Sequence, residues 1–580
     1  MLKRTKWSQQ EYSQEKINSI RKHFNIPTSI VKILLNRGID DFDAIDRFLN
    51  VRLRNLEDPF LLINMDKTVD VIIDAINDNK TIYGFGDYDV DGTTSLSILY
   101  LFLADVYDKE KVHYIVPNRQ SEGYGLNNSI IDDIKKGGGD LIITVDCGIS
   151  NYDEVEYANS IGVDVVVVDH HQIPVNIPNA RAILNPHLEG NKTLFKDMAA
   201  VGVTFNLLLA LRKTLRERGF FKDKKEPNLQ TYLDLVALGT VADVVPLLEE
   251  NRIFVKMGFV EMAHTTNYGL KALMEISGVV PPLDTTKVSF KIAPRINAAG
   301  RMSDANKVVE LFTTDSYEKA LEIAKVLDEE NTKRQQIERG IFQEIVSTIE
   351  NQRYKGTAII MANEKWHPGV IGIVAAKIVE KYNRPTFLFS IKGDIARGSS
   401  RSINNFDLYK ALSKYEELFI NYGGHKYAAG LSIDMKNFKK FEEMMQKEAN
   451  DFFADPDNLL HDIKIDDILD PREISIRYYN VIDQLSPFGM KNPQPVFGMR
   501  NLFPTDAQIV GERHLRLKLS SKNKKRFRAM GFNKSNLIKQ TSSYVDILFS
   551  IQLNQWKGKK HLQLNLKDLK KHGKNNFNFN

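Results

Sequence analysis

Short apolar runs alternate with helical stretches through the first half of the chain. Residues 141–145 (LIITV) and 165–168 (VVVV) are rich in β-branched side chains and are too short for helices, and the stretch near residues 150 to 160 between them has helical character. Apolar runs separated by a helix in this way are typical of parallel strands buried on both faces. The pattern therefore predicts an α/β domain built on a parallel sheet, over about residues 69–245.

A long helical pattern lies further along the chain. From about residue 317 to residue 351, apolar side chains recur near helical spacing with almost no breakers, while the middle, residues 328–336, is polar all round. We expect such a helix to bridge two domains and to form the wall of a cleft between them. Strand-like runs at 357–361 and 386–389 then predict a second α/β domain, over about residues 353–450.

The C-terminal part follows a period of two. Residues 514–519 (HLRLKL) alternate apolar and charged side chains, which predicts strands with one face in a core and a basic face outward. Near the N-terminus, residues 30–35 form an apolar helical face in an otherwise polar segment. We expect an N-terminal helical cap (1–68), the parallel-sheet domain (69–245), a connecting region with the long helix (246–352), the second α/β domain (353–450), a C-terminal β domain (451–574) and a disordered tail (575–580).

Composition indicates a globular protein from a reducing compartment. The chain has 580 residues, 42% of them hydrophobic and 26% charged, and its single cysteine, Cys147, excludes an internal disulfide. We expect Cys147 to be a buried small residue and not a nucleophile, because the neighbouring Asp146 disfavours a thiolate. The first eight residues carry no apolar core of a secretory signal, and no stretch reaches the ~18 apolar residues of a membrane span. The expected location is the cytoplasm.

The charge is unevenly distributed. Residues 511–580 contain 17 Lys and Arg against 3 acidic residues, a balance of +14, which leaves −9 for residues 1–510. Within the basic part, residues 525–532 (KRFRAMGF) mix aromatic and cationic side chains. One interpretation is a solvated surface that aids solubility. The other, which we favour, is a face that binds single-stranded nucleic acid, with Arg526 and Arg528 on the phosphates and rings under the bases.

The densest acidic motif directly follows the apolar run at residues 82–85. Asp87, Asp89 and Asp91 occupy alternate positions before Gly92. Carboxylates so close together repel one another unless a cation holds them, so the motif predicts a site for hard divalent metals. A calcium loop of the EF-hand type begins in the same way, but its twelfth position, here Ile98, requires a bidentate glutamate.

Further polar residues come directly after the later apolar runs. Asp146 follows residues 141–145, the pair His170 and His171 closes the run that ends before Asp169, and Asp243 leaves an apolar helical segment ahead of Pro246. Each one alone is also explained as a helix cap, a turn residue or a solvated pair. Because the carboxyl ends of strands in an open α/β sheet converge on one crevice, the groups together predict a centre for two divalent cations.

Four of these segments resemble the motifs of DHH phosphoesterases in order and approximate spacing. They are residues 87–92, 145–148 (VDCG), 169–171 (DHH) and 241–243 (VAD). Further segments resemble, more narrowly, the RecJ group of single-stranded-DNA exonucleases; these are 116–119 (VPNR), 122–126 (EGYGL), 293–301 (APRINAAGR), 367–372 (HPGVIG) and 423–430. One departure is Ser400, which replaces a glycine of the family's pattern in 398–402 and puts in doubt how closely the backbone approaches a phosphate there.

The resemblance implies a DHH catalytic domain, a long connecting helix, a DHH-associated domain and a C-terminal OB-like barrel. It implies a 5′→3′ exonuclease on single-stranded DNA that releases 5′-mononucleotides in DNA repair and recombination, with two Mn²⁺ or Mg²⁺ ions per site. The ligands would be Asp87, Asp89, Asp91, Asp146 as the bridging carboxylate, His170 and Asp243. His171 would orient a ligand or the attacking water, which makes Asp146, His170 and His171 the catalytic group.

The same resemblance places four groups near DNA phosphates. These are Arg295, Arg301, Arg401 and His425, with Arg401 and His425 closest to a terminal 5′ phosphate. For Arg295 and Arg301 the alternative is an interdomain ion pair. The implied partners are single-stranded DNA with a 5′ end, a RecQ-type helicase and single-strand-binding protein, and the implied state is a monomer without membrane contact. Two other hypotheses remain: a DHH-class phosphodiesterase acting on short oligonucleotides or cyclic dinucleotides, and a non-catalytic DNA-binding scaffold.

Overall fold

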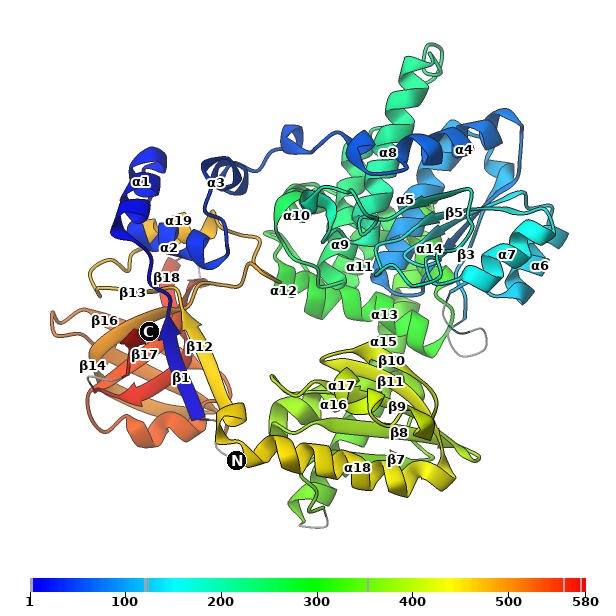
Figure 1. The fold of residues 1–580 in the computed structure, drawn as a ribbon. Coiled ribbons are helices and arrows are strands. Elements are labelled where there is room, and N and C mark those ends of the chain that lie inside the picture. Colours follow the sequence, from blue (N-terminus) through cyan, green and yellow to red (C-terminus); the bar gives the residue numbers. More distant parts are fainter. Residues whose placement is uncertain are drawn as a thin grey trace.

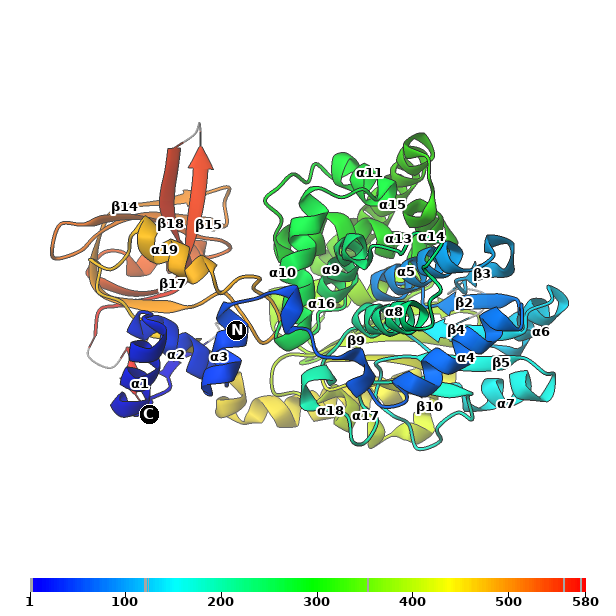
Figure 2. The same cartoon turned by 90° about the horizontal axis from the view of Figure 1, so that it is seen from above.

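The computed structural model places a body built on a parallel sheet, a second α/β domain beneath it and a β-barrel to one side (Figure 1). The view from above again separates the barrel and the N-terminal helices from the body (Figure 2). The structure describes residues 4–118, 123, 125–351, 354–556, 559–573 and 576–579. Among these residues, no helix has both the length and the apolar composition that a bilayer span requires.

The sheet of the body is parallel throughout, as its apolar runs predict. Its order is β3-β2-β4-β5-β6, and helices pack on both faces. After β2 the chain turns to one side to form β3 and then returns to the other side of β2 to form β4. The crevice of an open α/β sheet lies at such a reversal, here at the carboxyl ends of β2 and β4. The strands are β2 (Ile82–Gly86), β3 (Val112–Ile115), β4 (Leu141–Val145), β5 (Asp164–Val168) and β6 (Ala182–Leu184).

The helices around this sheet fall into two layers and an extension. One layer is α4 (Met65–Asn77), α5 (Val90–Val106), α8 (Ala200–Glu217) and α9 (Leu233–Ala242); the other is α6 (Asn128–Lys136) and α7 (Tyr152–Ser160). The extension consists of α10 (Glu249–Ala263), α11 (Tyr268–Ile276), α12 (Thr285–Lys287), the π-helix η6 (Val288–Ile292), α13 (Ala293–Met302) and α14 (Asn306–Thr313).

The predicted long helix is confirmed as α15 (Tyr317–Glu350), which runs from the body to the second domain (Figure 1). The side chains in its middle are polar, as the sequence shows, but those on one side of the helix are buried against neighbouring helices. There Arg334 donates hydrogen bonds to Glu338, at 2.9 Å, and to Asn331, so the buried polar groups satisfy one another.

The second domain is a five-stranded sheet covered on both faces. Its order is β10-β11-β9-β8-β7, with only β7 and β8 parallel. Helices α15 and α16 pack on one face and α18 on the other. The elements are β7 (Ile359–Asn363), α16 (Pro368–Tyr382), β8 (Thr386–Lys392), β9 (Ile395–Arg401), α17 (Leu408–Ser413), β10 (Phe419–His425), β11 (Ala428–Asp434) and α18 (Met435–Ala454).

The C-terminal strands close into a barrel because β14 pairs with β17 as well as with β15. Alternation at period two is confirmed in β15, where Leu517 is buried and the flanking Arg516 and Lys518 are exposed. The elements are β12 (Leu460–Ile465), β13 (Asp467–Ile468), α19 (Ile476–Asp483), β14 (Phe497–Val510), β15 (His514–Ser520), β16 (Arg526–Gly531), β17 (Val545–Trp556) and β18 (Lys559–Lys571).

The N-terminal residues do not form the purely helical cap that the sequence predicts. The segment opens with strand β1 (Arg4–Gln9), which pairs in parallel with β12, and its helices share a hydrophobic core with α19 and the barrel. An apolar helical face fixes only that a helix is buried, not which domain buries it. The helices are α1 (Gln14–Phe24), α2 (Thr28–Asn36) and α3 (Phe42–Leu49).

The expected disorder of the last residues is wrong for the part that the structure describes. Strand β19 (Asn578–Phe579) pairs with β1. Phe577 is 5% exposed and packs on Trp7 with ring centroids 5.0 Å apart. Trp7 in turn donates its indole N–H to Asp568 in the barrel, at 2.8 Å. Burial of two aromatic rings offsets the entropy lost in ordering this polar segment.

Candidate metal centre

The acidic motif lies at the carboxyl end of β2, and Asp146 lies at the carboxyl end of the neighbouring β4. Asp89 caps α5 by accepting a hydrogen bond from Gly92 N at 3.0 Å. A Cβ on Gly92 would come within 2.5 Å of Asp87 O, so the tight turn requires glycine. The calcium-loop alternative fails, because the motif runs from a strand into α5, where Ile98 is buried.

The start of α8 holds Asp91 in place. Its carboxylate accepts hydrogen bonds from Ala200 N, at 2.8 Å, and Val201 N, at 2.9 Å, the first residues of that helix. A helix N-terminus favours a negative charge. Burial nevertheless raises the pKa of Asp91 well above its ordinary value, and the charges of Asp243 and Asp89 raise it further. The carboxylate therefore needs more positive charge than the backbone supplies.

Backbone strain accompanies two of the candidate ligands. Asp146 has φ +61°, and Val244, next to Asp243, has φ +62°, a region that β-branched residues rarely adopt. Such strain persists where the surroundings fix the backbone, commonly at functional sites. Asp146 is also buried, and burial together with the charges of Asp91, Asp89 and Asp87 raises its pKa well above the ordinary range.

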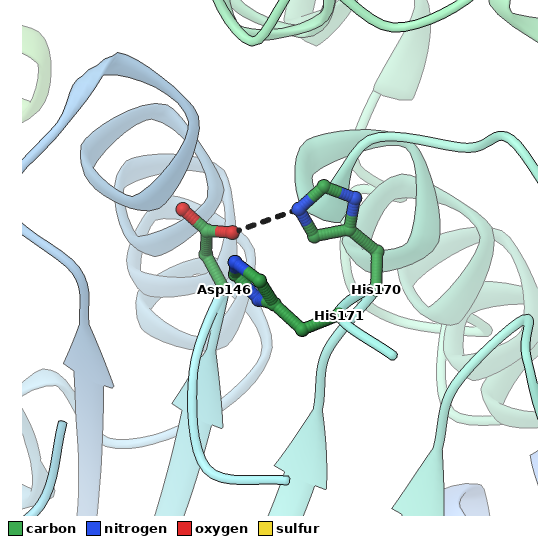
Figure 3. Close-up of side chains that lie close together, drawn as sticks. All are labelled: Asp146, His170 and His171. Carbon is green, nitrogen blue, oxygen red and sulfur yellow. Dashed lines mark ion pairs between the residues drawn. The ribbon is translucent and has the colours of Figure 1, made fainter. Parts of the chain in front are cut away.

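His170 points its Nε2 into the cluster. This nitrogen lies 3.2 Å from Asp146 Oδ1 (Figure 3). It also lies 3.7 Å from Asp243 Oδ2. Its Nδ1 lies 3.1 Å from Met198 O. A carbonyl only accepts hydrogen bonds, so the Nδ1 carries the proton and the Nε2 lone pair is left for a cation.

Asp169 organises the histidine pair. Its Oδ1 accepts hydrogen bonds from the backbone N–H groups of His170 and His171 and lies 2.7 Å from His171 Nδ1, while Oδ2 accepts from Ile149 N at 3.0 Å. Burial raises the pKa of Asp169, but the His171 interaction and the backbone donors outweigh it, so the net shift is downward. Burial lowers the pKa of His171, and Asp169 reverses the shift to a net rise.

The sequence did not predict this role for Asp169. Its place immediately before two histidines at a strand end is the signal that could have found it, because a buried carboxylate there must accept hydrogen bonds.

Three overlapping groups of donor atoms result, and within each group the atoms lie within 4.8 Å of one another. They are Asp87, Asp89 and Asp146; Asp91, His170 and Asp243; and Asp146, His170 and His171. In addition, the buried Asp243 Oδ2 has no hydrogen-bond donor among the described residues. Carboxylate oxygens with one or two imidazoles are a donor set that suits Mn²⁺ and Mg²⁺, so the residues fit these ions.

Cys147 lies beside this cluster as a buried residue, as expected. Burial, followed by the charge of Asp169, raises the pKa of its thiol well above the ordinary value. A thiol in this environment stays protonated and does not act as a nucleophile.

Helix α13 packs directly on the acidic motif. A Cβ on Gly300 would come within 2.6 Å of Tyr88 O. Arg295 pairs with Asp328 of α15 at 2.8 Å. Both residues lie in the connecting region, so this ion pair is not the interdomain pair considered as the alternative to phosphate binding. Arg301 donates to Gly369 O at 3.0 Å, at the start of α16, and so connects the body to the second domain.

The second domain presents Arg401 and His425 in register, on strands that flank Ala428 of β11. Arg401 is half-buried, donates to Ser400 O at 2.8 Å and to Ser399 Oγ at 3.3 Å, and has no carboxylate partner among the described residues. Burial lowers its pKa. Ser400 is buried and its hydroxyl donates to Ala429 O. As neighbours on β9, the side chains of Ser400 and Arg401 lie on opposite faces of the sheet.

The basic face of the barrel differs in part from the expectation. Arg526 and Arg528 are exposed, but Phe527 between them is 8% exposed and belongs to the core. Phe532 is 53% exposed and its ring packs edge-on against His514, with ring centroids 5.5 Å apart. Arg119, Glu122 and Tyr124 of the quoted motifs lie outside the described residues.

The chain has a parallel sheet, an acidic cluster where its strand order reverses, a long helix and a second α/β domain. Together these features define a DHH phosphoesterase architecture. Comparison with protein families agrees: the DHH family N-terminal domain matches residues 81–240, the DHHA1 domain matches 338–452 and the RecJ OB domain matches 465–568.

Curated relatives show which family of DHH phosphoesterases the chain belongs to. The single-stranded-DNA-specific exonuclease RecJ of Bacillus subtilis is 32% identical over 574 residues, 98% of this chain and 71% of the relative. The RecJ of Escherichia coli is 33% identical over 556 residues, 93% of this chain and 95% of the relative. The chain therefore belongs to the RecJ family.

Solved structures agree with this assignment. The crystal structure of RecJ from Thermus thermophilus in complex with Mn²⁺ matches with a TM-score of 0.82 at 28% identity, covering 99% of this chain and 80% of that one. The Mg²⁺ complex from the same organism matches with a TM-score of 0.77 at 27% identity, covering 99% and 79%. Metal-bound relatives with the same fold support the assignment of the acidic cluster as a divalent-metal centre.

Proposed function

We propose that this protein is a single-stranded-DNA-specific exonuclease that hydrolyses phosphodiester bonds with two divalent cations. The observation that carries the proposal is the set of overlapping donor groups at the carboxyl ends of β2 and β4, in a RecJ-family fold. Divalent cations bound there would lower the pKa of a coordinated water and would stabilise charge on phosphate oxygens.

The overlap of the donor groups supports the expected set of ligands. Asp87 and Asp89 on one side, and Asp91 and Asp243 on the other, define two adjacent positions, and Asp146 takes part in two of the three donor groups. Asp146 is therefore the carboxylate suited to bridge two ions. Its carboxylate belongs to the first position, and its Oδ1 lies 3.2 Å from His170 Nε2, which belongs to the second.

His170 and His171 have different tasks in this proposal. The proton on His170 Nδ1 is fixed by Met198 O, which keeps Nε2 as a ligand. His171 is anchored through Nδ1 to Asp169, and about half of its side chain is exposed. It can therefore donate a hydrogen bond from Nε2 to a phosphate oxygen, and Asp169 stabilises the cationic form that does so.

We infer that the direction of digestion comes from the second domain. Arg401 is a half-buried cation without a carboxylate partner among the described residues, and a guanidinium grips a phosphate in two-point fashion. His425 lies in register with it. A terminal 5′ phosphate held by this pair would place the first phosphodiester bond at the metals, which predicts 5′→3′ digestion and release of 5′-mononucleotides.

The test is digestion of single-stranded oligonucleotides labelled at the 5′ or the 3′ end, with Mn²⁺ or with chelator, by the wild type and by Asp146→Ala. We expect early release of labelled mononucleotide from the 5′ end only, lost with chelator and in the variant. Cleavage confined to dinucleotides or cyclic dinucleotides would support the alternative phosphodiesterase. Binding of intact DNA without cleavage under all conditions would support a scaffold.

We infer further that the enzyme acts as a monomer in the cytoplasm, on strands that other proteins expose during repair and recombination. An enzyme restricted to single strands needs duplex DNA to be unwound first. A helicase of the RecQ type and a single-strand-binding protein are the corresponding partners.

A further inference from the structure

Phe290 is a large aromatic side chain that the fold holds in solvent. It is 77% exposed, although it lies in the middle of a continuous helical segment from α12 through η6 to α13. Most phenylalanines of the described chain lie in the cores instead. An exposed ring next to a functional site is a candidate contact for a ligand.

The π-helical turn that displays Phe290 has an identifiable cause. Pro294 has no N–H to donate to Phe290 O, and Ala293 N bonds to Val288 O, five residues earlier. Arg295 completes the turn by donating to Lys291 O. Single π-helical turns occur frequently at functional sites.

This turn is also fixed from outside. The guanidinium of Arg295 bonds to Asp328 of α15 at 2.8 Å while it holds Lys291 O. The ion pair therefore ties the π-helical turn to the long helix. Phe290 is thus presented from a braced element and not from a loop.

The segment leads directly to the metal centre. Helix α9, which packs against η6, ends at Asp243, and α13 reaches the acidic motif through Gly300 and Tyr88. Ten residues separate Phe290 from Gly300, which at a rise of 1.5 Å per residue is roughly 15 Å. In Figure 1 this segment follows the side of the body that faces the barrel and the second domain.

A cavity continues from the other end of the segment. It has a volume of about 830 Å³ and lies between α12 and strand β17 of the barrel; its polar lining includes Lys256, Lys287, Tyr479, Gln494, Asn554 and Lys560. Thr285 donates to Phe488 O at 2.7 Å and fixes α12 to the loop before the barrel. Lys291, beside Phe290, is exposed and has no carboxylate partner among the described residues.

We propose that Phe290 is a stacking platform for one base of the single strand, a few nucleotides from the bond that is cut. The strand would run from the cavity at the barrel past Phe290 to the metal centre, with Lys291 near its phosphates. A ring stacks on every kind of base, so the contact tolerates any sequence. In a duplex, neighbouring base pairs cover both faces of each base, so this platform also selects single strands. The inference rests on the proposed function and adds to it a residue that determines specificity.

The experiment uses the full chain with chelator, so that DNA is bound but not cut. A set of 5′-phosphorylated single-stranded oligonucleotides carries the fluorescent base 2-aminopurine at one position each, from the first to the tenth. We expect quenching at one internal position in the wild type, its loss in Phe290→Ala and its return in Phe290→Trp. At fixed salt, the affinity of Phe290→Ala should fall roughly 5- to 150-fold, the value of one base stack.

Tyr268→Ala provides the matched control, because Tyr268 is an exposed ring on α11. It should retain both quenching and affinity. Equal affinity and an unchanged quenching pattern in Phe290→Ala would overturn the inference. Cleavage of the same oligonucleotides by the wild type with Mn²⁺ is measured in parallel. If the wild type does not cleave them, the proposed function fails. If it cleaves them and Phe290→Ala binds them as the wild type does, only this inference fails.

Discussion

Replacement of Gly300 by alanine tests how α13 supports the metal centre. The added Cβ would lie 2.6 Å from Tyr88 O and 3.2 Å from Tyr88 Cβ. Alanine in a helix interior gains about 1 kcal/mol over glycine, while overpacking against backbone costs about 1 to 3 kcal/mol. The net expectation is a loss of about 0 to 2 kcal/mol in the free energy of unfolding.

Gly340 offers a matched control on α15, because no atom lies within 4 Å of the position of its Cβ. Gly340→Ala should therefore stabilise the protein by about 0.5 to 1 kcal/mol, since only helix propensity changes. The two variants carry the same chemical change, but only the Cβ added at Gly300 contacts the acidic motif.

Metal affinity separates displacement of the motif from a general loss of stability. Tyr88 lies between Asp87 and Asp89, so relief of the clash moves both carboxylates. We expect Mn²⁺ binding by Gly300→Ala, measured by calorimetric titration, to weaken about 10- to 100-fold, the usual effect of disturbing residues that support ligands. Wild-type affinity in Gly300→Ala, with unfolding like that of Gly340→Ala, would refute the role of α13 as a support for the metal centre.

Three further outcomes are expected. Trp7→Phe should lower the free energy of unfolding in urea by about 1 to 3 kcal/mol, because Asp568 loses its buried indole donor; an unchanged urea midpoint would show that this hydrogen bond between β1 and the barrel is dispensable. Burial raises the pKa of Glu250 to about 7 from an ordinary value of 4.5, so the folded state retains a proton that the unfolded state releases, and stability falls as pH rises from about 4.5 to 7. Glu250→Gln should flatten that slope between pH 5 and 7.5 in chemical denaturation, and an identical slope would contradict the shift. Arg401→Lys should abolish a preference for 5′-phosphate over 5′-hydroxyl ends in initial rates of digestion, whereas a retained preference would place the end-binding group elsewhere.

The sequence was sufficient to predict the features that depend on residues close together along the chain. Apolar runs that end in Asp87, Asp146 and His170 fixed both the parallel strands and the edge where these side chains meet. Period-two alternation likewise predicted the exposed Arg526 and Arg528. The same alternation puts Phe527 on the inner face, so its burial could have been predicted from the pattern itself.

Contacts between distant segments were not predictable in this way. The partner of Arg295 depends on how α13 packs on α15, and the anchor of Asp91 is the start of a helix 109 residues later. The order of the last residues depends on Trp7 at the opposite end of the chain. In each case the sequence fixes the side-chain chemistry, while tertiary packing selects the partner.

Anomalous diffraction at the manganese edge from crystals of the wild-type protein grown with Mn²⁺ tests the central claim most directly. The account predicts two adjacent peaks, one among Asp87, Asp89 and Asp146 and one among Asp91, His170 and Asp243. Absence of both peaks, or ordered manganese only at another surface of the molecule, would contradict it.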